Sequence, residues 1–294
     1  MGSLINCKEL ANDILESAKL KCEKIKNKHD IVPNLAIITV GDDPASKVYV
    51  RNKIKACEKV GIEVNHYEFP ETFMPTDLEQ FVARLNFDHN VHGIIVQQPL
   101  PRTGLYKMFN ASDSITNTID PVKDVDGFST YNIGGLITNN KYTLQAATPA
   151  GVMKIIKQEI DDLAGKRVVV IGRSKTVGLP LVNMLINEQA TVTCCNSKTH
   201  DLSVYTKNAD IVVSAVGKIC FLTPSFFSDN TLIIDVGINR DSNGKLLGDV
   251  DPCVVDCFPN VKVTPVPGGV GPMTVAMLIK NVIDASESVH YKND

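Results

Sequence analysis

The chain has 294 residues, of which 44% are hydrophobic and 21% charged, and its formal net charge is -3 at pH 7. This composition supplies apolar material for two folded domains and excludes a disordered chain. The weakly acidic balance disfavours a nucleic-acid partner, and no apolar run approaches the roughly 18 residues that cross a membrane. We therefore expect a cytosolic, two-domain protein that contacts neither nucleic acid nor membrane.

The cysteines do not follow a metal-binding pattern. There are eight of them without a CxxC pair, and Cys253 and Cys257 lack a second pair that would complete a tetrahedral site. We expect reduced, mostly buried thiols and no bound metal.

Short β-branched runs alternate with helical patterns along the chain. The lysine-rich residues 19–28 are typical of the solvated face of a first helix. After it come candidate strands at residues 35–40, 93–96, 167–171, 191–195, 211–215 and 232–236, with helical patterns at residues 48–60 and 179–186. This alternation predicts an α/β fold with parallel strands and helices on both faces.

The helix that contains residues 48–60 has a recognisable start and end in the sequence. Asp43 can cap it, Pro44 suits its first turn, and Gly61 is a natural stop. Tyr49 and Lys53 are four residues apart and therefore share one helical face, where they could present an aromatic ring and an amine to one ligand. Such pairs are also common as surface contacts, so this pair alone leaves both interpretations open.

Polar residues follow the strand predicted at residues 93–96. Gln97 and Gln98 stand at its carboxyl end, where parallel sheets bind ligands. Further on, Asp124 and Asp126 lie in an acidic turn, and a carboxylate there could accept two hydrogen bonds from a planar amino-heterocycle. Asp124 also fits the role of a turn cap, and for Asp126 the two interpretations are equally supported.

A domain boundary is predicted near Thr148-Pro149, because an X-Pro step interrupts the preceding element before a helix at residues 151–160. A second crossing is predicted late in the chain. There, the glycine- and proline-rich loop at residues 265–272 precedes a helical pattern at residues 273–283, which could pack on either domain.

The strand at residues 167–171 runs into a glycine turn that opens a helix. Backbone N–H groups and the positive end of the helix can hold a pyrophosphate in this arrangement. The spacing departs from GxGxxG, since Ser174 replaces the second glycine and Gly178 comes one position late. A tight strand-to-helix turn without a ligand also fits the pattern, but its place in a βαβ unit favours a dinucleotide.

The end of the next strand discriminates between dinucleotides. Asn196, Ser197 and Lys198 follow residues 191–195, and no acidic side chain is present to bind a ribose hydroxyl and repel a phosphate. Arg173 with Ser197 can instead supply donors and positive charge for the extra phosphate of NADP. Lys198 fits equally well as a solvated loop lysine, so the prediction of NADP rests on the other two residues.

Five ordered segments together resemble one family. They are GDDPASKVYVRNK at residues 41–53, HGIIVQQPLP at residues 92–101, KDVDG at residues 123–127, GRS with VG between residues 172 and 178, and PGGVGPMT at residues 267–274. This combination resembles the bifunctional methylenetetrahydrofolate dehydrogenase/cyclohydrolases.

The resemblance implies a two-domain α/β homodimer. Residues 1–147 would form the folate-binding catalytic domain, residues 148–274 a Rossmann-type NADP domain, and residues 275–294 a helix that packs back on the first domain. The implied activity is the NADP-dependent oxidation of 5,10-methylenetetrahydrofolate to the 5,10-methenyl form, and its hydrolysis to 10-formyltetrahydrofolate, in the one-carbon metabolism that serves purine biosynthesis. The implied partners are tetrahydrofolate substrates and a second copy of the chain.

The resemblance also assigns roles. Lys53 would be the catalytic lysine, Tyr49 would stack on the aminobenzoyl ring of the folate, Gln97 would hold and tune Lys53, and Asp126 would grip the pterin. The remaining folate contacts would be Val96, Gln98, Pro267, Gly268, Gly269, Val270 and Gly271. The cofactor contacts would be Thr148, Gly172, Arg173, Ser174, Ser197, Ala215, Ile238 and Thr274.

Two segments depart from the family pattern, namely Ala146-Ala147, where Pro-Cys is usual, and Asn196, where histidine is frequent. Neither removes a catalytic group. A dehydrogenase-only member of the family is one alternative, although Lys53 and Gln97 argue against it. A small-acid NADP dehydrogenase of the shikimate type, and a catalytically silent folate- or nucleotide-binding regulator, are the other two.

Overall fold

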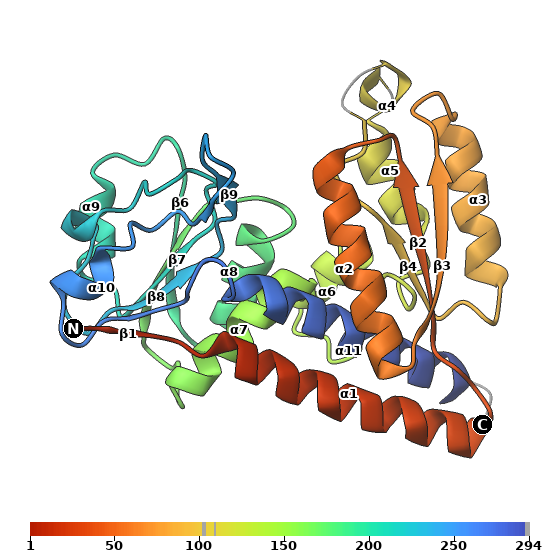
Figure 1. Cartoon of the computed structure of the whole chain (residues 1–294), viewed down its shortest axis with the longest axis horizontal. Coiled ribbons are helices and arrows are strands. Elements are labelled where there is room, and N and C mark those ends of the chain that lie inside the picture. The colour runs from red at the N-terminus through yellow and green to blue at the C-terminus, as the bar shows by residue number, and fades with distance from the viewer. Residues whose placement is uncertain (102–103, 109, 292–294) are drawn as a thin grey trace. The chain divides into compact units, whose positions relative to one another are not determined.

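The computed structural model describes residues 1–101, 104–108 and 110–291, and the chain forms two compact units that we describe separately (Figure 1). We name them after their sheets. The six-stranded unit consists of Met1–Asn12 and Thr148–Thr274, and the three-stranded unit consists of Asp13–Ala147 and Val275–Asp294.

The three-stranded unit is built on a parallel sheet of order β3-β2-β4. The central strand β2 (Asn34–Val40) pairs with β3 (Glu63–Phe69) and with β4 (Gly93–Val96). Strands β2 and β4 are almost completely buried, as their uninterrupted apolar sequences require, whereas β3 alternates between exposed and half-buried positions. The outer position of β3 explains this alternation.

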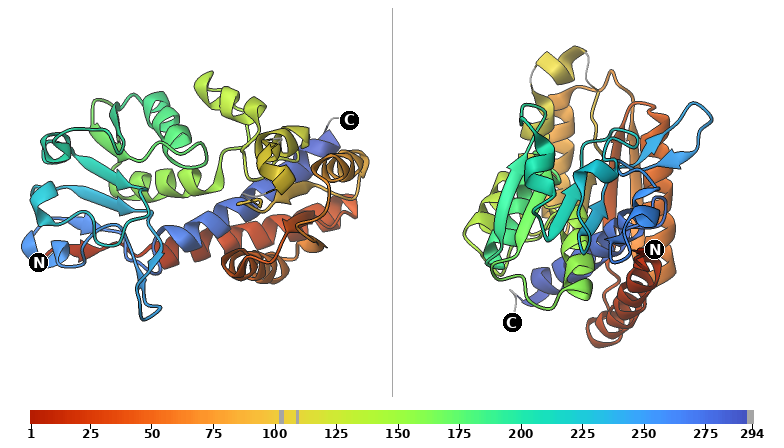
Figure 2. Two further views of the ribbon diagram at one scale, coloured as in Figure 1. Left: turned by 90° about the horizontal axis from the view of Figure 1, so that it is seen from above. Right: turned by 90° about the vertical axis from the view of Figure 1, so that its left-hand side faces the viewer.

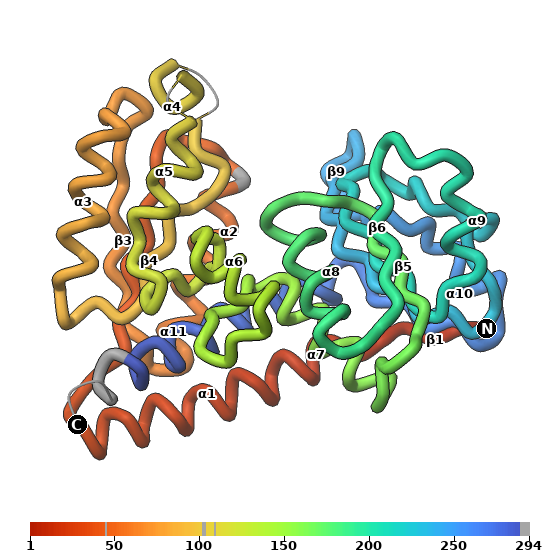
Figure 3. The backbone as a smooth tube through the Cα atoms, turned by 180° about the vertical axis from the view of Figure 1, so that it is seen from behind, coloured from red at the N-terminus to blue at the C-terminus, as the bar shows by residue number. Residues whose placement is uncertain are grey.

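Helices cover both faces of this sheet. Helix α2 (Pro44–Val60) lies on one face, and α3 (Pro75–Phe87) with α5 (Ala111–Thr118) lies on the other (Figures 1 and 3). The other helices of this unit, wholly or in part, are α1 (Cys7–His29), α4 (Gly104–Met108), α6 (Thr130–Ile137) and α11 (Val270–Tyr291). Apolar residues of β2, β4, α3 and α5 pack into one continuous core that supports the carboxyl ends of the strands.

Helix α2 begins and ends where its sequence predicts. Asp43 Oδ2 accepts a hydrogen bond from the backbone N of Ser46 at 2.7 Å, and Pro44 occupies the first turn. Gly61 ends the helix in the left-handed conformation at φ 89°, which an L side chain rarely adopts. These local contacts confirm the predicted start and end.

The six-stranded unit contains a parallel sheet of order β1-β11-β8-β7-β5-β6. Its strands are β1 (Ser3–Leu4), β5 (Arg167–Ile171), β6 (Thr191–Cys195), β7 (Ile211–Ser214), β8 (Leu232–Asp235) and β11 (Lys262–Val263). The chain runs from β5 outward to β6 and then returns to the other side of β5 as β7. The strand order therefore reverses between β5 and β7, the place at which doubly wound sheets bind ligands.

Short helices and one hairpin complete this unit. The helices are α7 (Ala147–Glu159), α8 (Gly178–Asn187), α9 (Leu202–Thr206), α10 (Val254–Cys257) and the 3₁₀ turn η1 (Pro224–Phe226). Strands β9 (Asn239–Arg240) and β10 (Leu246–Leu247) pair antiparallel. The buried side chains of β5, β7 and β8 form the centre of this unit's core.

Several elements differ from the sequence prediction. Strand β3 is polar and only partly buried, while β1 and β11 span two residues each, so none of the three has a strong pattern of its own. Helix α7 begins at Ala147, four residues before the predicted start, because Pro149 lies in its first turn, where no N–H donor is needed. Helix α11 likewise begins at Val270, within the predicted loop.

The later part of α11 belongs to the three-stranded unit and runs beside α1 (Figure 2). Asn281 Nδ2 donates to the carbonyl oxygens of Val125 at 2.9 Å and Gln145 at 2.8 Å, and Lys21 Nζ lies 3.7 Å from Asp284 Oδ1. These contacts confirm that the C-terminal helix returns to the first half of the chain. Residues 292–294 of the predicted segment lie outside the described residues, and residues 1–12, predicted in the folate domain, group with the six-stranded unit.

The cysteines are all free, but the prediction of mostly buried thiols is wrong. Cys194, Cys253 and Cys257 are exposed, and Cys220 is half-buried. In the described ranges, no His, Cys, Asp or Glu residues gather in a group of three that could hold a metal ion. No helix within those same ranges has the length and apolar character to cross a bilayer.

Candidate active site and dinucleotide site

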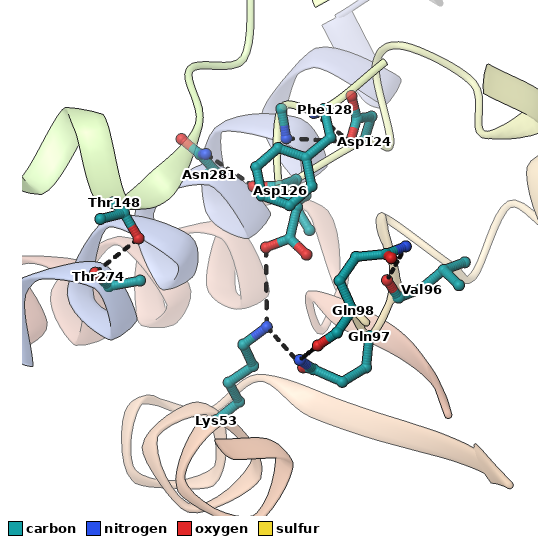
Figure 4. Close-up of polar contacts among 12 residues, drawn as sticks. Lys53, Val96, Gln97, Gln98, Asp124, Asp126, Phe128, Thr148, Thr274 and Asn281 are labelled. Carbon is teal, nitrogen blue, oxygen red and sulfur yellow. Dashed lines mark hydrogen bonds and ion pairs between the residues drawn. The ribbon is translucent and has the colours of Figure 1, made fainter. Parts of the chain in front are cut away.

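Lys53 lies on α2 with its amine directed toward two acceptors from other elements (Figure 4). Its Nζ donates to Gln97 Oε1 at 3.2 Å and lies 3.9 Å from Asp126 Oδ1. The Lys53 and Asp126 side chains keep 13% and 15% of their exposure. The structure thus brings together three of the four residues predicted as catalytic, in a partly shielded position.

Gln97 is held in one orientation by a second hydrogen bond. Its Nε2 donates to the backbone oxygen of Gln98 at 2.7 Å, so its oxygen atom is the end of the amide that faces Lys53. Because Gln97 follows the buried strand β4, the position of this amide is set by the sheet. Gln97 therefore offers Lys53 an acceptor without a charge.

The two carboxylates of the acidic turn have different surroundings. Asp124 is 1% exposed and accepts four hydrogen bonds, from the backbone N atoms of Gly127, Phe128 and Ser129 and from Asn132 Nδ2. Asp126 instead points toward Lys53 (Figure 4). The turn-cap interpretation is thus confirmed for Asp124, while Asp126 keeps acceptor capacity for another group.

Burial raises the pKa of the Asp126 carboxyl group. The neighbouring Lys53 ammonium opposes this rise, and the Asp124 carboxylate adds to it. Asp126 consequently takes up a proton more readily than an exposed aspartate. Its ability to accept two hydrogen bonds will fall as the pH is lowered.

Lys123, in the same turn, has a role that local sequence did not suggest. Its Nζ donates to the carbonyl oxygens of Leu85 at 3.1 Å, Asn86 at 2.8 Å and Asp88 at 2.8 Å, at the end of α3. Burial lowers the pKa of this amine. Lys123 therefore ties the acidic turn to a helix end, where its charge complements the helix dipole.

The other predicted folate contacts of the three-stranded unit differ in accessibility. Tyr49 is 47% exposed and lies one helical turn before Lys53. Val96 is buried at the end of β4. Gln98 is engaged within the protein, because its Oε1 accepts from Leu100 N at 3.3 Å and from Ser112 Oγ at 3.1 Å. Tyr49 is thus available to a ligand, whereas Gln98 mainly supports the segment after β4.

A groove of about 490 Å³ runs along another side of α2. It is lined by charged side chains of α2, including Arg51 and Glu58, and by His66 and Glu68 of β3. Gln97 also lines it, but Lys53, Tyr49 and Asp126 do not. This groove is therefore adjacent to the Lys53 cluster and not centred on it.

In the six-stranded unit, the glycine turn closes tightly at the reversal of strand order. Gly172 has φ 117°, and a Cβ there would lie 2.4 Å from the Ala215 carbonyl oxygen, while a Cβ on Gly178 would lie 2.0 Å from the Gly172 carbonyl oxygen. Ser174 Oγ accepts from the backbone N atoms of Val177 and Gly178 at 3.1 and 3.3 Å. The altered glycine spacing thus allows a tight turn in which Gly178 lies against the Gly172 carbonyl and Ser174 accepts hydrogen bonds at the start of the following helix.

The segment after β6 forms a compact turn that exposes its donors. Asn196 N donates to Thr199 Oγ1 at 2.9 Å, and Asn196 Oδ1 accepts from Lys198 N at 2.9 Å. Ser197 and Arg173 are exposed. Because β5 and β6 are parallel neighbours, the segments that carry Arg173 and Ser197 follow the same edge of the sheet.

The remaining predicted cofactor residues also belong to the six-stranded unit. Thr274 Oγ1 donates to Val270 O at 3.1 Å and lies 3.0 Å from Thr148 Oγ1, so Thr148 is the donor in that pair. Ile238 is 45% exposed, and a Cβ on Gly271 would lie 3.7 Å from its Cδ1. The predicted cofactor residues therefore gather at two places within this unit, one around Gly172 and one around Thr274.

The predicted folate loop lies in the six-stranded unit, whereas Lys53 lies in the other unit. A Cβ on Gly269 would lie 2.4 Å from the Pro265 carbonyl oxygen, and Gly268 has φ 102°. Pro267 is exposed, and Val270 and Gly271 begin α11. The loop is thus a tight turn that leads directly into the last helix.

Two family models match successive parts of the chain. Residues 5–126 match the tetrahydrofolate dehydrogenase/cyclohydrolase catalytic domain, and residues 146–290 match the NAD(P)-binding domain of the same family. The chain belongs to the tetrahydrofolate dehydrogenase/cyclohydrolase family. This membership confirms the predicted two-domain α/β fold and sets aside the small-acid dehydrogenase.

Full-length relatives agree with this family. The chain is 44% identical over 291 residues to the bifunctional protein FolD of Magnetococcus marinus, which covers 99% of both chains. The structure of the bifunctional FolD methylenetetrahydrofolate dehydrogenase/cyclohydrolase from Campylobacter jejuni superposes with a TM-score of 0.91 at 41% identity, covering 98% of this chain and 99% of that one. The Trypanosoma brucei enzyme, solved with NADP cofactor and an inhibitor, gives a TM-score of 0.89 at 32% identity over 98% of each chain.

Family membership confirms the prediction of a bifunctional enzyme with dehydrogenase and cyclohydrolase activities. It also confirms an NAD(P)-binding domain. Sequence reasoning missed the contacts of Lys123 with the end of α3 and two buried carboxylates of the six-stranded unit, Asp235 and Asp249. The segment GDVD at residues 248–251 could have indicated the burial of Asp249. Its acidic residues stand next to a glycine and an apolar residue and not in a charged run.

Proposed function

We propose that this enzyme oxidises 5,10-methylenetetrahydrofolate with NADP and hydrolyses the 5,10-methenyl product to 10-formyltetrahydrofolate, as a cytosolic homodimer. The observation that carries the proposal is the placement of the Lys53 amine 3.2 Å from Gln97 Oε1 and 3.9 Å from Asp126 Oδ1. Within this partly shielded site, the amine and its neutral acceptor suit the hydrolysis, and the carboxylate suits binding of the substrate that both reactions share.

The oxidation needs orientation more than a strong base. A hydride leaves the methylene carbon, and the lone pairs of the adjacent folate nitrogens N5 and N10 stabilise the methenyl cation. Tyr49, exposed and one turn from Lys53, is suited to stack on the aminobenzoyl ring. In this proposal, Tyr49 holds the aminobenzoyl ring and Asp126 holds the pterin, so that the methylene carbon between them lies beside Lys53.

The hydrolysis needs a proton acceptor. Water attacks the methenyl carbon and loses one proton to the neutral Lys53 amine. That proton passes to N5 as the bond between N5 and the carbon breaks, and the second water proton leaves the hydroxyl for solvent as the formyl C=O forms. Gln97 directs the amine, since the orientation of its own amide is set by Gln98 O.

Asp126 is suited to bind the pterin. Its carboxylate can accept two parallel hydrogen bonds from the amino-pyrimidine edge of the ring. When the carboxylate is engaged in this way, its charge is shared with the pterin, and Gln97 becomes the main polar partner of Lys53. Substrate binding would thus leave the amine directed by Gln97 toward the reacting carbon.

The residues at the carboxyl edge of the six-stranded sheet fit NADP. Gly172 admits close approach at the reversal of strand order, and exposed Arg173 and Ser197 can donate to a 2′-phosphate, with no acid in the turn after β6 to repel it. Ser174, Ala215, Ile238, Thr148 and Thr274 would complete the contacts. Bound NADP would supply the hydride acceptor, and the hydroxyl pair of Thr148 and Thr274 would hold its carboxamide.

Val96, Gln98 and the loop Pro267–Gly271 are proposed as the remaining folate contacts. Val96 and Gln98 flank Gln97 and shape the end of β4, while the loop enters α11 beside Ile238. Their expected contribution is shape, because their side chains are apolar, absent or already hydrogen-bonded.

The proposal is tested by mixing purified enzyme with methylenetetrahydrofolate and either NADP or NAD, while the formation of reduced nicotinamide is followed. Methenyltetrahydrofolate is supplied in a second assay, and its decay is compared with the uncatalysed rate. We expect NADP to be reduced with a higher kcat/KM than NAD, and methenyl decay faster than the blank. Reduction without accelerated hydrolysis would indicate the dehydrogenase-only alternative, and absence of both reactions would contradict the proposal.

A further inference from the structure

A buried carboxylate lies below the carboxyl edge of the six-stranded sheet. Asp249 is 0% exposed, and it stands between β10 and α10. Its two oxygens accept from five donors, which are Ser214 Oγ at 2.9 Å, Val216 N at 2.8 Å, Gly217 N at 3.3 Å, Lys218 N at 2.9 Å and Asn239 Nδ2 at 3.2 Å. Burying a carboxylate is costly unless its oxygens are satisfied, and here they are.

Three of these donors are successive backbone N–H groups of the loop after β7. Successive N–H groups that converge form an anion-binding nest, and Asp249 occupies this one. The fifth donor, Asn239, belongs to the segment after β8. One carboxylate therefore ties together the loops that follow two adjacent strands.

A second carboxylate holds Asp249 in place. Asp235 is 3% exposed, and it accepts from the backbone N atoms of Gly237 at 3.0 Å, Asp249 at 3.0 Å and Val250 at 2.9 Å. The backbone N of Asp235 donates to Thr264 Oγ1 at 2.7 Å, which fixes the main chain beside this carboxylate. The segment that carries Asp249 is thus fixed at both its main chain and its side chain.

Two glycines leave room for these carboxylates. A Cβ on Gly237 would lie 2.2 Å from Asp249 Oδ1, and a Cβ on Gly248 would lie 1.9 Å from Asp235 Oδ2. Both distances are far shorter than a carbon-to-oxygen contact allows. The local sequence is therefore adapted to admit the two side chains against the backbone.

The loops held by Asp249 are those assigned to the cofactor. Ala215 begins the loop after β7, its N donates to Ile171 O at 2.8 Å, and its carbonyl oxygen faces Gly172. Ile238 lies in the segment after β8, between Gly237 and Asn239. The carboxylate lies beneath both segments and, being buried, does not itself reach the surface that a dinucleotide would touch.

We propose that Asp249 is a positioning residue for NADP, which fixes the loops after β7 and β8 in the conformation that receives the dinucleotide. The proposal rests on the proposed function, because it takes Ala215 and Ile238 as cofactor contacts. Asp249 acts through the backbone of residues 216–218 and through Asn239. The role is to hold the cofactor site in its binding conformation before the cofactor arrives.

The main test replaces the carboxylate by an amide in Asp249→Asn. One oxygen would become an NH2 group facing N–H donors, so the loops should shift. We expect the KM and the dissociation constant for NADP to rise roughly 10- to 100-fold, with kcat at saturating NADP lowered less than about threefold. The matched control is Asp210→Asn, whose carboxylate accepts from Arg167 N at 2.8 Å at the opposite edge of the same sheet. The control should bind NADP as the parent does.

A milder variant covers the case in which Asp249→Asn does not fold. Ser214 is 0% exposed and cannot touch a cofactor, so Ser214→Ala removes one donor to Asp249 and can act only through it. We expect a rise of about threefold or more in the dissociation constant for NADP. Ser286→Ala, which removes an equally buried hydroxyl in the three-stranded unit, is the control for stability.

The outcomes separate this inference from the proposed function. Parent-like NADP affinity in Ser214→Ala, or in a folded Asp249→Asn, would overturn the positioning role while leaving the cofactor assignment intact. A parent enzyme that does not bind NADP would overturn the cofactor assignment and the positioning role together. Weaker NADP binding in Ser214→Ala with parent-like binding in Ser286→Ala supports the role of Asp249.

Discussion

Asp126 and Asp249 are both shielded carboxylates, one in each unit, but their partners differ. Asp249 accepts from five donors and has no capacity left for a ligand. Asp126 has a 3.9 Å ion pair with Lys53 and keeps 15% of its side-chain exposure. A carboxylate with its hydrogen bonds filled by the protein organises backbone, whereas one with unused acceptor capacity is available to bind substrate.

The same contrast divides two neighbours in one turn. The Asp124 carboxylate accepts hydrogen bonds from four donors, whereas Asp126, two residues later, faces Lys53. Identical side chains therefore have different surroundings, because the turn directs one inward and the other toward Lys53. The following predictions test whether unused hydrogen-bonding capacity marks the functional groups.

The largest effect is expected for Lys53→Met. Loss of the proton acceptor should lower cyclohydrolase turnover by roughly 100-fold or more. The measurement is the decay of methenyltetrahydrofolate, and the matched control is Lys55→Met, an exposed lysine on the same helix. Retention of turnover by Lys53→Met would show that the amine does not transfer the proton.

The next effect contrasts Asp126→Asn with Asp124→Asn. Asp126→Asn should raise the KM for folate about 10- to 100-fold, because it removes the bidentate acceptor. The free energy of unfolding should change little. Asp124→Asn should lower the free energy of unfolding by roughly 2–4 kcal/mol, because its amide opposes N–H donors. Steady-state kinetics gives the KM for folate of each variant, and urea unfolding gives its free energy of unfolding. Equal changes of both quantities in the two variants would contradict the different roles of Asp124 and Asp126.

A pH effect on stability is expected from Asp235. Burial raises its pKa to about 6. The folded state therefore binds this proton at a higher pH than the unfolded state, so the stabilisation is complete below about pH 4 and is lost as the pH rises through 6. The loss amounts to roughly 3 kcal/mol, since each pKa unit corresponds to about 1.4 kcal/mol.

Urea unfolding at several pH values between 4 and 7.5 measures this contribution. The decline in stability with rising pH should be shallower in Asp235→Asn, which cannot titrate. An equal slope in the variant and the parent would contradict the assignment of this proton to Asp235.

The smallest effect concerns cofactor preference. Arg173→Ala should lower the ratio of kcat/KM for NADP to that for NAD by about tenfold, because one charged hydrogen bond to the 2′-phosphate is lost. Ser197→Ala should lower it less. Lys207→Ala, an exposed lysine at the end of α9, is the control and should leave the ratio unchanged. An unchanged ratio in Arg173→Ala would place phosphate recognition elsewhere.

Local sequence predicted the elements whose signals are self-contained. The cap at Asp43, the stop at Gly61 and the buried strands β2, β4, β5, β7 and β8 follow from short-range hydrogen bonding and from unbroken apolar runs. Strand β3 was missed because its partly polar sequence becomes a strand only by pairing with β2. Likewise, the exposure of Cys194 at the end of β6 depends on packing and not on its own neighbours in the chain.

By itself, the sequence determined the family, the two-domain α/β fold and the residue types of the site, because ordered motifs and apolar periodicity are properties of the chain. Only the tertiary structure decided which chemical groups meet. Lys53 and Gln97 are 44 residues apart, and Ser214 and Asp249 are 35 apart. Contacts at such separations depend on how strands and loops align, and a local pattern carries no information about that alignment. The structure therefore distinguished Asp126 from Asp124 and showed the buried carboxylates beneath the loops after β7 and β8.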